Sequence, residues 1–294
     1  MSEKNENIIR RATGLLVIEV VNSNPNGDPD RESDPRTRPD RKGEISPVSF
    51  KRKVRDLLED KDGPTWQTIK ARFTPPLDAG EFEILESPRR VLEKVFKEAK
   101  EGKFLPKYWD ARVFGNTLLE KNAPQCVATG VVQFGLGLSI APIVIERMTN
   151  TNKSPVQANK TRGMAPLAYR VVEHAVYTMP FFVNASAARK TECTVRDIEV
   201  LQNLIPLAYS QTSSYIRASV EIRHAWYVEH KSALGSASDL ELIAMLTPRK
   251  RERPDEPSRR WEDYEAPLAL PEGLQTRVAP LRDLMVEAYA AVGS

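Results

Sequence analysis

The chain has 294 residues, of which 40% are hydrophobic, so it can bury a substantial core as one large domain or as one domain with sizeable insertions. Its formal net charge of +3 is too small to indicate a nucleic-acid partner by itself. Two cysteines far apart in sequence, no apolar run of membrane-spanning length and a polar N-terminus favour a reduced, cytoplasmic protein with no membrane partner.

A buried central strand is predicted over residues 14–21, because apolar residues occupy both of its faces apart from Glu19. A tight polar loop, NSNPNGDPD, follows at residues 22–30. Its amide side chains and backbone N–H groups are of a kind that can face a ligand. The amides belong to Asn22, Asn24 and Asn26.

A cationic helix is predicted after this loop, with Ser46 as its N-cap and Pro47 in its first position. One face of the helix is apolar and carries Phe50, Val54, Leu57 and Leu58. The sides and the opposite face carry Lys51, Arg52, Lys53 and Arg55. A helix start rich in cations suits a phosphate backbone, which makes a nucleic-acid platform the first hypothesis.

Residues 62–108 are interrupted by several prolines and predict an insertion outside the core, with one helix at about 88–101. A short helix is predicted over 110–119. A strand follows over 126–136, and its glycines indicate a bulge or the close approach of another backbone.

A long excursion between two strands is predicted over 139–166, which is polar and lacks strong periodicity. From Arg147 to Val172 the chain has five basic residues and no acidic one, the composition of an arm that lies along a polyanion. Met148 and Met164 are flexible apolar side chains that could wedge against bases or pack at the base of a hairpin. The returning strand is predicted over 167–179.

The remaining elements complete an alternating order. A helix begins at Thr194, with Asp197 placed as in a capping box, and a strand covers 219–229. Alternation places Val220, Ile222, His224, Trp226 and Val228 on one face of that strand, and Glu221, Arg223, Tyr227 and Glu229 on the other. Helices at 236–246 and 280–291 flank a proline-rich segment whose basic cluster, Arg249–Arg251, favours a solvated linker.

The core order is thus βαββαβ, which predicts an α+β fold with a ferredoxin-like or RNA-recognition sheet and insertions. That order alone does not identify a function.

A catalytic site is not indicated by the motifs. Asp28, Asp30, Asp34 and Asp40 could gather a metal ion, but the arginines between them favour solvated turn formers. His224 is expected in a core or subunit contact, and the other histidines and both cysteines lack catalytic companions in sequence. We therefore expect a non-catalytic binding protein with no cofactor.

Five segments in order carry a family resemblance, over roughly residues 12–230: VVNSNPNGDPD, ISPVSFKRKVRDLL, WDARVFGNTL, GVVQFGLGLSIAPI and YTMPFF. The chain resembles the backbone subunit of type I CRISPR Cascade complexes, within the repeat-associated (RAMP) superfamily, and is most similar to that of type I-C.

The resemblance implies a modified RNA-recognition palm formed by residues 12–61, 109–138 and 167–235. It also implies a finger or web insertion at 62–108 and a thumb hairpin at 139–166, with a C-terminal helical extension at 236–294. Such subunits polymerise head to tail along crRNA, kink it at regular intervals and present it for pairing with target DNA in antiviral defence. The implied partners are crRNA, target DNA, further copies and the other Cascade subunits, namely the 5′-handle cap and the large and small subunits.

Carried over by motif, the palm contacts with RNA would be Asn22, Asn24, Asn26, Lys51, Arg52 and Arg55, with Gln133 as a further candidate. The thumb contacts would be Arg147, Lys153, Lys160 and Arg162, and base kinking would fall to Met148 and Met164. Two alternatives stay open. One is a metal-dependent target-RNA endonuclease, as in type III relatives, using Asp28 or Asp34. The other is a stand-alone RNA-binding module.

Overall fold

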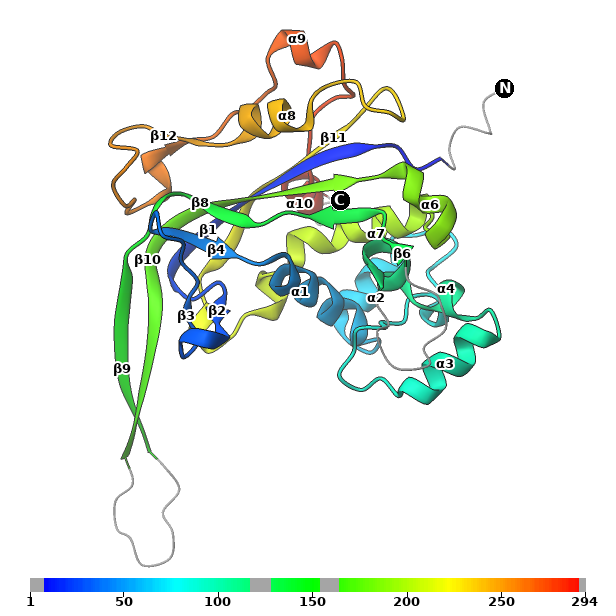
Figure 1. Cartoon of the computed structure of the whole chain (residues 1–294), viewed down its shortest axis with the longest axis horizontal. Helices are drawn as coiled ribbons and strands as arrows, with labels where there is room; N and C mark the ends of the chain where they lie inside the picture. The colour runs from blue at the N-terminus through cyan, green and yellow to red at the C-terminus, as the bar shows by residue number, and fades with distance from the viewer. Residues whose placement is uncertain (1–7, 117–127, 154–163, 291–294) are drawn as a thin grey trace, which may run out of the picture.

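The computed structural model describes residues 8–116, 128–153 and 164–290, and its centre is strand β1 (Ala12–Ser23). This strand pairs antiparallel with β10 (Met164–Val183) on one side and with β11 (Val220–Glu229) on the other (Figure 1). Residues 15–18 have no exposed surface because both faces of the sheet are covered. The predicted central strand is confirmed.

The chain has a mixed α/β fold built on one eight-stranded antiparallel sheet, in the order β14-β11-β1-β10-β8-β4. Two further strands, β7 and β9, also pair with β10. The added strands are β4 (Lys42–Ile45), β7 (Val132–Phe134), β8 (Gly137–Pro142), β9 (Ile145–Lys153) and β14 (Arg282–Asp283). Small two-stranded pairs are β2 (Gly27–Asp28) with β3 (Asp34–Pro35), β5 (Gly115–Asn116) with β6 (Ala128–Thr129), and β12 (Arg249–Lys250) with β13 (Tyr264–Glu265).

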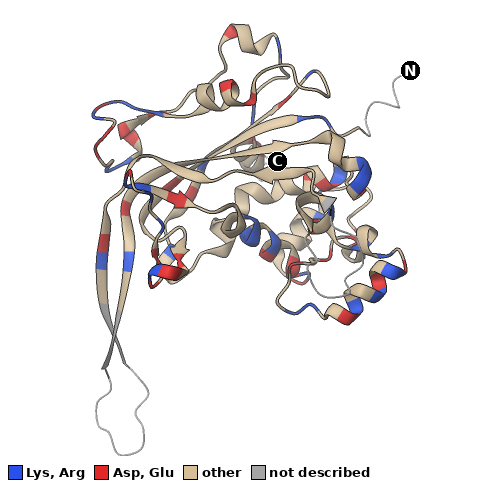
Figure 2. Cartoon of the chain, in the orientation of Figure 1, with Lys and Arg blue, Asp and Glu red and all other residues tan. Residues whose placement is uncertain are grey.

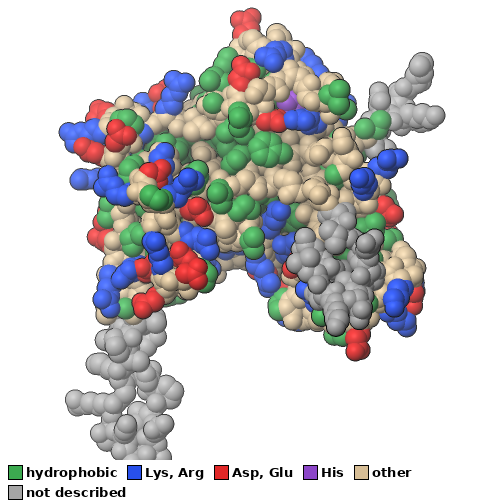
Figure 3. Space-filling model, in the orientation of Figure 1, with side chains coloured by type: hydrophobic (Ala, Val, Ile, Leu, Met, Phe, Trp, Pro, Cys, Tyr) green, Lys and Arg blue, Asp and Glu red, His purple; other side chains and the backbone are tan. Residues whose placement is uncertain are grey.

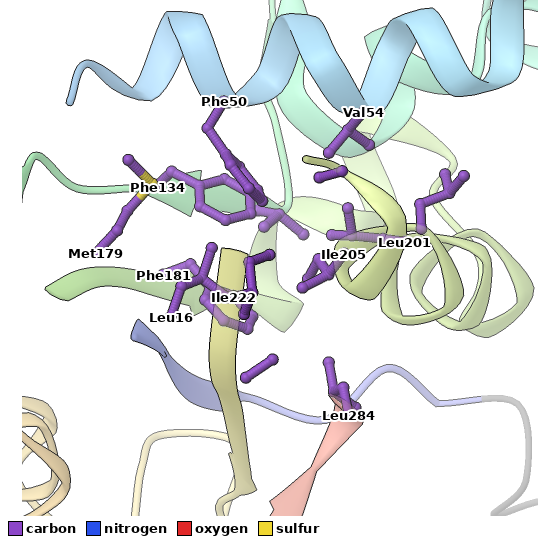
Figure 4. Close-up of a cluster of buried hydrophobic side chains, with 14 of the residues drawn as sticks. Leu16, Phe50, Val54, Phe134, Met179, Phe181, Leu201, Ile205, Ile222 and Leu284 are labelled. Carbon is purple, nitrogen blue, oxygen red and sulfur yellow. The ribbon is translucent and has the colours of Figure 1, made fainter. Parts of the chain in front are cut away.

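Helices cover one face of the sheet and enclose the main core (Figure 4). They are α1 (Pro47–Glu59), α2 (Pro64–Ala71), α5 (Trp109–Phe114), α6 (Ala185–Thr191), α7 (Val195–Leu204) and α10 (Leu284–Ala290). Phe50 and Val54 of α1 reach Phe134 and Phe181 of the sheet, whose rings stack at 5.1 Å. Within the described ranges, no helix has the length and apolar content needed to cross a membrane.

Short 3-10 helices connect several of these elements: η1 (Pro29–Arg31), η2 (Ala79–Glu81), η3 (Ile205–Leu207), η4 (Ser210–Thr212), η5 (Tyr215–Arg217) and η6 (Trp261–Asp263). Of the last two helical turns before β11, η4 lies beside α1, where Lys53 contacts Thr212, and η5 follows it.

The insertion at 62–108 is not outside the core, and this prediction is wrong for its first half. Trp66 and Ile69 of α2 are buried in the main cluster, with Leu77, Phe82 and Ile84. Only the second half forms a cluster of its own, around Leu85, Val95, Phe104, Tyr108 and Ala111. The helix expected at 88–101 is α3 (Leu92–Lys100), and α4 (Phe104–Lys107) follows it.

A buried ion pair joins α5, which directly follows this insertion, to α7. The Arg112 guanidinium donates to both carboxylate oxygens of Asp197, at 2.7 and 3.0 Å, and to three backbone carbonyls. Asp197 also accepts from the Thr194 N–H at 2.8 Å, which completes the predicted capping box. The Asp197 carboxylate therefore holds the start of α7 and also Arg112, whose guanidinium binds the three carbonyls of the insertion.

The strand expected at 126–136 is divided in two, into β6 and β7. Gly130 lies at the break, where a Cβ atom would overlap the backbone of Phe114 and Gly115. The expected close approach of another backbone is thereby confirmed. The short helix expected over 110–119 begins at Trp109 and ends at Phe114; residues 117–127 lie outside the described residues.

Replacing Gly130 with alanine should destabilise the protein by about 2 kcal/mol, because buried backbone must shift to admit the methyl group. Urea denaturation would measure this loss. The matched control is Gly273→Ala in α9 (Glu272–Gln275), where a Cβ meets nothing within 4 Å and the change should stay within about 0.5 kcal/mol. Equal stability of the two variants would contradict the close approach.

A long hairpin of β9 and β10 projects from the sheet, and we call it the thumb hairpin (Figure 1). Its described pairing runs from Val172 with Ile145 to Met164 with Lys153. The expected excursion therefore contains a hairpin, but its bounds differ. Residues 137–142 are a sheet strand, and the returning arm is continuous with the 20-residue strand β10.

The regular alternation expected over 219–229 is interrupted by a bulge. The register of β11 against β1 shifts between His224 and Ile222. The side chains after the bulge therefore face the opposite side of the sheet from the one that alternation predicts. Tyr227 consequently stacks on Phe181 in the main core, and Trp226 points to the opposite face. His224 packs as expected of a structural histidine: it stacks on Trp226 at 4.5 Å and contacts Asp283 at 2.8 Å.

The C-terminal segment covers the second face of the sheet, so it is not a linker. Its basic cluster is nevertheless solvated as predicted, with Arg249 and Arg251 exposed and Lys250 half-buried. Helices α8 (Asp239–Leu246) and α9 (Glu272–Gln275) lie above the sheet in Figure 1. A second core forms there, in which Val17 and Trp226 of the sheet meet Leu242, Tyr264 and Leu274. The basic cluster begins as strand β12, which pairs with β13.

Candidate nucleic-acid interface

The loop after β1 fixes the start of α1. Asn26 Oδ1 accepts a hydrogen bond from the Ser46 N–H at 2.7 Å, and Ser46 Oγ accepts from the Ser49 N–H at 3.2 Å. Pro47 occupies the first helical turn. The predicted cap is confirmed, and it sets the rotation of the helix that buries Phe50 and Val54.

Two lysines at this helix start are desolvated. Lys51 lies half-buried with its ammonium 5.2 Å from the centre of the Phe114 ring, while Lys53 is 7% exposed and was expected on a solvated side. Burial and then Arg55 lower the pKa of Lys51 to about 8. Burial and then Arg217 lower the pKa of Lys53 to about 8, although Asp56 acts in the opposite direction.

Neither lysine has an ion-pair partner within the part of the chain that the structure describes. The Lys53 ammonium donates instead to Thr212 Oγ1 at 2.9 Å and to its carbonyl at 3.3 Å, and it lies 5.1 Å from the Tyr209 ring. Cations that have lost water without gaining a carboxylate form a site that an anion would stabilise. Figure 2 shows the adjoining cationic turns of α1.

Arg52 and Arg55 differ in their exposure to solvent and in the burial of their ion-pair partners. Arg52 is exposed and its Nε lies 2.7 Å from Asp56, a surface pair that a phosphate can replace. Arg55 is largely buried, and its Nε lies 2.8 Å from Asp110, which is 1% exposed. Arg55 therefore holds α1 to α5 besides any contact with RNA.

Two of the three loop asparagines, Asn24 and Asn26, point inward, contrary to the expectation that their amides face a ligand. Asn24 is 2% exposed and donates to the Ser33 carbonyl at 2.7 Å. Asn26 is 8% exposed and caps the approach to α1. Asn22 is exposed, in the left-handed region with φ 44°. The polar side chains of this loop mainly order its own backbone.

The other predicted contacts lie on β7 and on the thumb hairpin. Gln133 is half-buried and donates to the Gly130 carbonyl at 3.2 Å. Arg147 is exposed opposite Arg170, beside the half-buried Met148. The backbones of Lys153 and Met164 pair at the far end of the described hairpin. Lys160 and Arg162 lie outside the described residues.

Lys and Arg side chains are exposed on the face that includes α1, between the thumb hairpin and the helical insertion (Figure 3). A sequence model of one protein family matches most of the chain: the model of CRISPR-associated protein Cas7 covers residues 10–269. The chain belongs to the Cas7 family.

Solved structures show a distant likeness to this Cas7-family chain. Two are titled "CRISPR RNA-guided surveillance complex" and "CRISPR RNA-guided surveillance complex, pre-nicking". Their TM-scores are 0.46 and 0.48, each with 15% identity over 75% of this chain, covering 69% and 78% of the respective chains. A third, titled as a type III-B Cmr-beta complex bound to cognate target RNA, has a TM-score of 0.39 and 12% identity, covering 75% of this chain and 61% of that one. No curated protein matches the sequence.

Asp28 and Asp34, the candidate aspartates of the endonuclease alternative, take part in turns and ion pairs in this Cas7-family chain. Asp28 Oδ1 accepts from the Asp30 N–H at 3.2 Å, and Asp34 is ion-paired with Arg170 of the thumb hairpin. No group of three or more His, Cys, Asp or Glu suited to a metal ion occurs among the residues described. Asp34 thereby attaches the loop to the root of the thumb hairpin.

The fold supplies two histidines with companions that the sequence did not reveal. His174 contacts Ser258 Oγ at 2.8 Å and Glu19 at 3.1 Å on opposite ring nitrogens, and His230 contacts Thr13 and Asp239. Ser258 is 4% exposed and Thr13 is fully buried, so a substrate cannot reach either hydroxyl. These clusters join the C-terminal segment to the sheet.

Sequence reasoning missed the segment η4–η5, which contacts both α1 and the loop after β1. Lys53 donates to Thr212, and Arg217 Nε donates to the Asn24 carbonyl at 3.1 Å. An aromatic residue two positions before an arginine, within the polar run SQTSSYIRAS, was the signal available in the sequence.

Proposed function

We propose that this Cas7-family chain is a non-catalytic backbone subunit of a type I-C-like Cascade complex and binds the guide crRNA. The lysine pair at the start of α1 carries the proposal. Lys51 and Lys53 are desolvated without an ion-pair partner in the described structure, so a phosphate backbone would satisfy charges that the protein leaves uncompensated.

The order of the strands in the sheet supports a division of the chain into a palm, a finger or web, a thumb and a C-terminal extension. Residues 12–61, 109–138 and 167–235 would form an RNA-recognition-like palm, which the neighbouring order β11-β1-β10-β8 supports. Residues 62–108 would be the finger or web, and the hairpin within 139–166 the thumb. Residues 236–294 would be an extension that covers the second face of the palm.

In this proposal the subunits polymerise head to tail along crRNA, and each thumb kinks the guide at a regular interval. The exposed bases then pair with target DNA, so base pairing reads the sequence and the protein holds the strand. Partners would be crRNA, target DNA, further copies and the cap, large and small subunits of Cascade.

Co-expression with a CRISPR array tests the proposal. We expect the purified protein to carry crRNA, with several protein copies for each RNA by native mass spectrometry. A one-to-one complex would count against polymerisation. Regular cleavage of target RNA in magnesium, lost in Asp28→Ala or Asp34→Ala, would replace the scaffold with the endonuclease alternative.

Replacing Lys51 or Arg52 with glutamine should weaken RNA binding equally for all sequences. Each loss should flatten the plot of log affinity against log salt concentration by about one unit, because one phosphate contact disappears. Fluorescence anisotropy over a salt series measures both quantities. Lys97→Gln, on exposed α3, is the control and should change neither. Loss confined to certain RNA sequences would show that these side chains read bases.

A further inference from the structure

An aromatic pair stands where the thumb hairpin leaves the sheet. Tyr215 of η5 meets Tyr169 of β10 with ring centres 5.4 Å apart and planes at 69°, and their hydroxyls lie 3.4 Å apart. The Tyr215 residue is nevertheless 63% exposed. An edge-to-face contact of this kind orients one ring while a large part of it stays open to solvent.

The segment that carries Tyr215 is firmly held. The Asn24 N–H donates to the Ile216 carbonyl at 2.7 Å, and Arg217 Nε donates to the Asn24 carbonyl at 3.1 Å. Three residues before Tyr215, both the carbonyl and the hydroxyl of Thr212 accept from Lys53. The segment that carries the exposed ring is thus fixed to the loop after β1 and to α1, and it connects Lys53 with the thumb hairpin.

Two cationic residues, Arg217 and Lys53, belong to this segment or contact it. Arg217 lies two residues on, and it is close enough to Lys53 to oppose that lysine's charge. No ion pair joins Arg217 to a carboxylate in the described parts of the chain. A single exposed tyrosine needs no explanation by itself. A fixed exposed ring beside uncompensated cations has the composition of a site that stacks a base and neutralises its phosphates.

We propose that Tyr215, held edge-on by Tyr169, is a stacking platform for one unpaired base of an RNA strand whose adjoining phosphate lies on Arg217. The assignment rests on the RNA binding proposed above and deepens it. Stacking needs only the flat face that every base has, so the platform takes any base, as a guide of variable sequence requires.

The test compares Tyr215→Ala, Tyr215→Phe and the unchanged protein on two labelled strands: an oligouridine and an abasic ribose-phosphate strand of equal length. Anisotropy titrations at several salt concentrations measure affinity. Tyr215→Ala should weaken oligouridine binding about tenfold, whereas Tyr215→Phe keeps the ring and should stay within about twofold. The three proteins should bind the abasic strand equally and share one salt dependence.

Other results would overturn the assignment. Unchanged oligouridine affinity in Tyr215→Ala, an equal loss on the abasic strand, or a flatter salt dependence would each exclude stacking. If the unchanged protein binds neither strand, the proposed function fails with it; if it binds and Tyr215→Ala is neutral, only the platform fails. Because Tyr215 is 63% exposed, the thermal unfolding of all three proteins should coincide.

Discussion

Replacing Asp197 with alanine should lower the free energy of unfolding by about 3–5 kcal/mol. Asp197 and Arg112 are 1% and 5% exposed, so the substitution leaves a guanidinium buried without its counter-charge. It also removes the acceptor for the Thr194 N–H at the start of α7. Equilibrium urea denaturation gives the value directly.

Two comparisons isolate the buried charge as the cause. Glu256→Gln breaks the exposed pair with Arg253 and should cost less than about 1 kcal/mol. The double variant Arg112→Met with Asp197→Leu removes both charges, so it should be more stable than Asp197→Ala alone. A double variant less stable than the single one would show that the carbonyl contacts of Arg112, rather than its charge, dominate.

RNA affinity should fall as the pH rises through about 8. In the free protein the pKa values of Lys51 and Lys53 are lowered to about 8, and a bound phosphate would raise them again. Binding above pH 8 therefore requires proton uptake, which reduces affinity by up to about tenfold per pH unit for each lysine. Anisotropy titrations at constant ionic strength from pH 7 to pH 9 would follow this loss.

The stability of the free protein should respond to pH with the opposite sign. Between pH 8 and the ordinary lysine pKa of 10.5, the unfolded chain binds more protons than the folded one, so these two lysines make folding more favourable as the pH rises. Urea denaturation at pH 8 and pH 9.5 would detect the change, which distinguishes a specific loss of binding from alkaline unfolding.

Lys51→Arg is the matched variant, because an arginine stays charged throughout this range. The variant should bind RNA at pH 7. Its RNA affinity should fall less steeply with rising pH, because binding then requires the uptake of one proton fewer. Lys97→Arg on α3 should leave the profile unchanged. An identical profile for Lys51→Arg and the unchanged protein would mean that another group is responsible.

Local signals predicted the start of α1 and the start of α7 correctly. Ser46 with Pro47, and Thr194 with Asp197, cap their helices through contacts within a few residues, so sequence spacing alone specifies them. The apolar face of α1 was equally clear. The burial of its cations was not predictable, because Lys53 and Arg55 are covered by residues that are distant in sequence.

The loop asparagines and strand β11 show where such reasoning stops. An asparagine in a polar loop can face a ligand or order the backbone, and here the Ser46 N–H, 20 residues away, takes the amide oxygen of Asn26. Alternation along β11 fails at a bulge that only the pairing with β1 reveals. The sequence of the C-terminal segment indicates a linker, because its buried residues are widely spaced among prolines and charged residues.

The sequence by itself determined the central strand, the capped cationic helix and the hairpin, and its motifs placed the chain in the Cas7 family. These features depend on periodicity and on contacts between near neighbours. Only the tertiary structure decided which cations are desolvated, that Arg55 is committed to Asp110, and that Tyr215 and Tyr169 meet at the root of the thumb hairpin. Burial and charge compensation arise between residues far apart in the chain, and no local pattern records them.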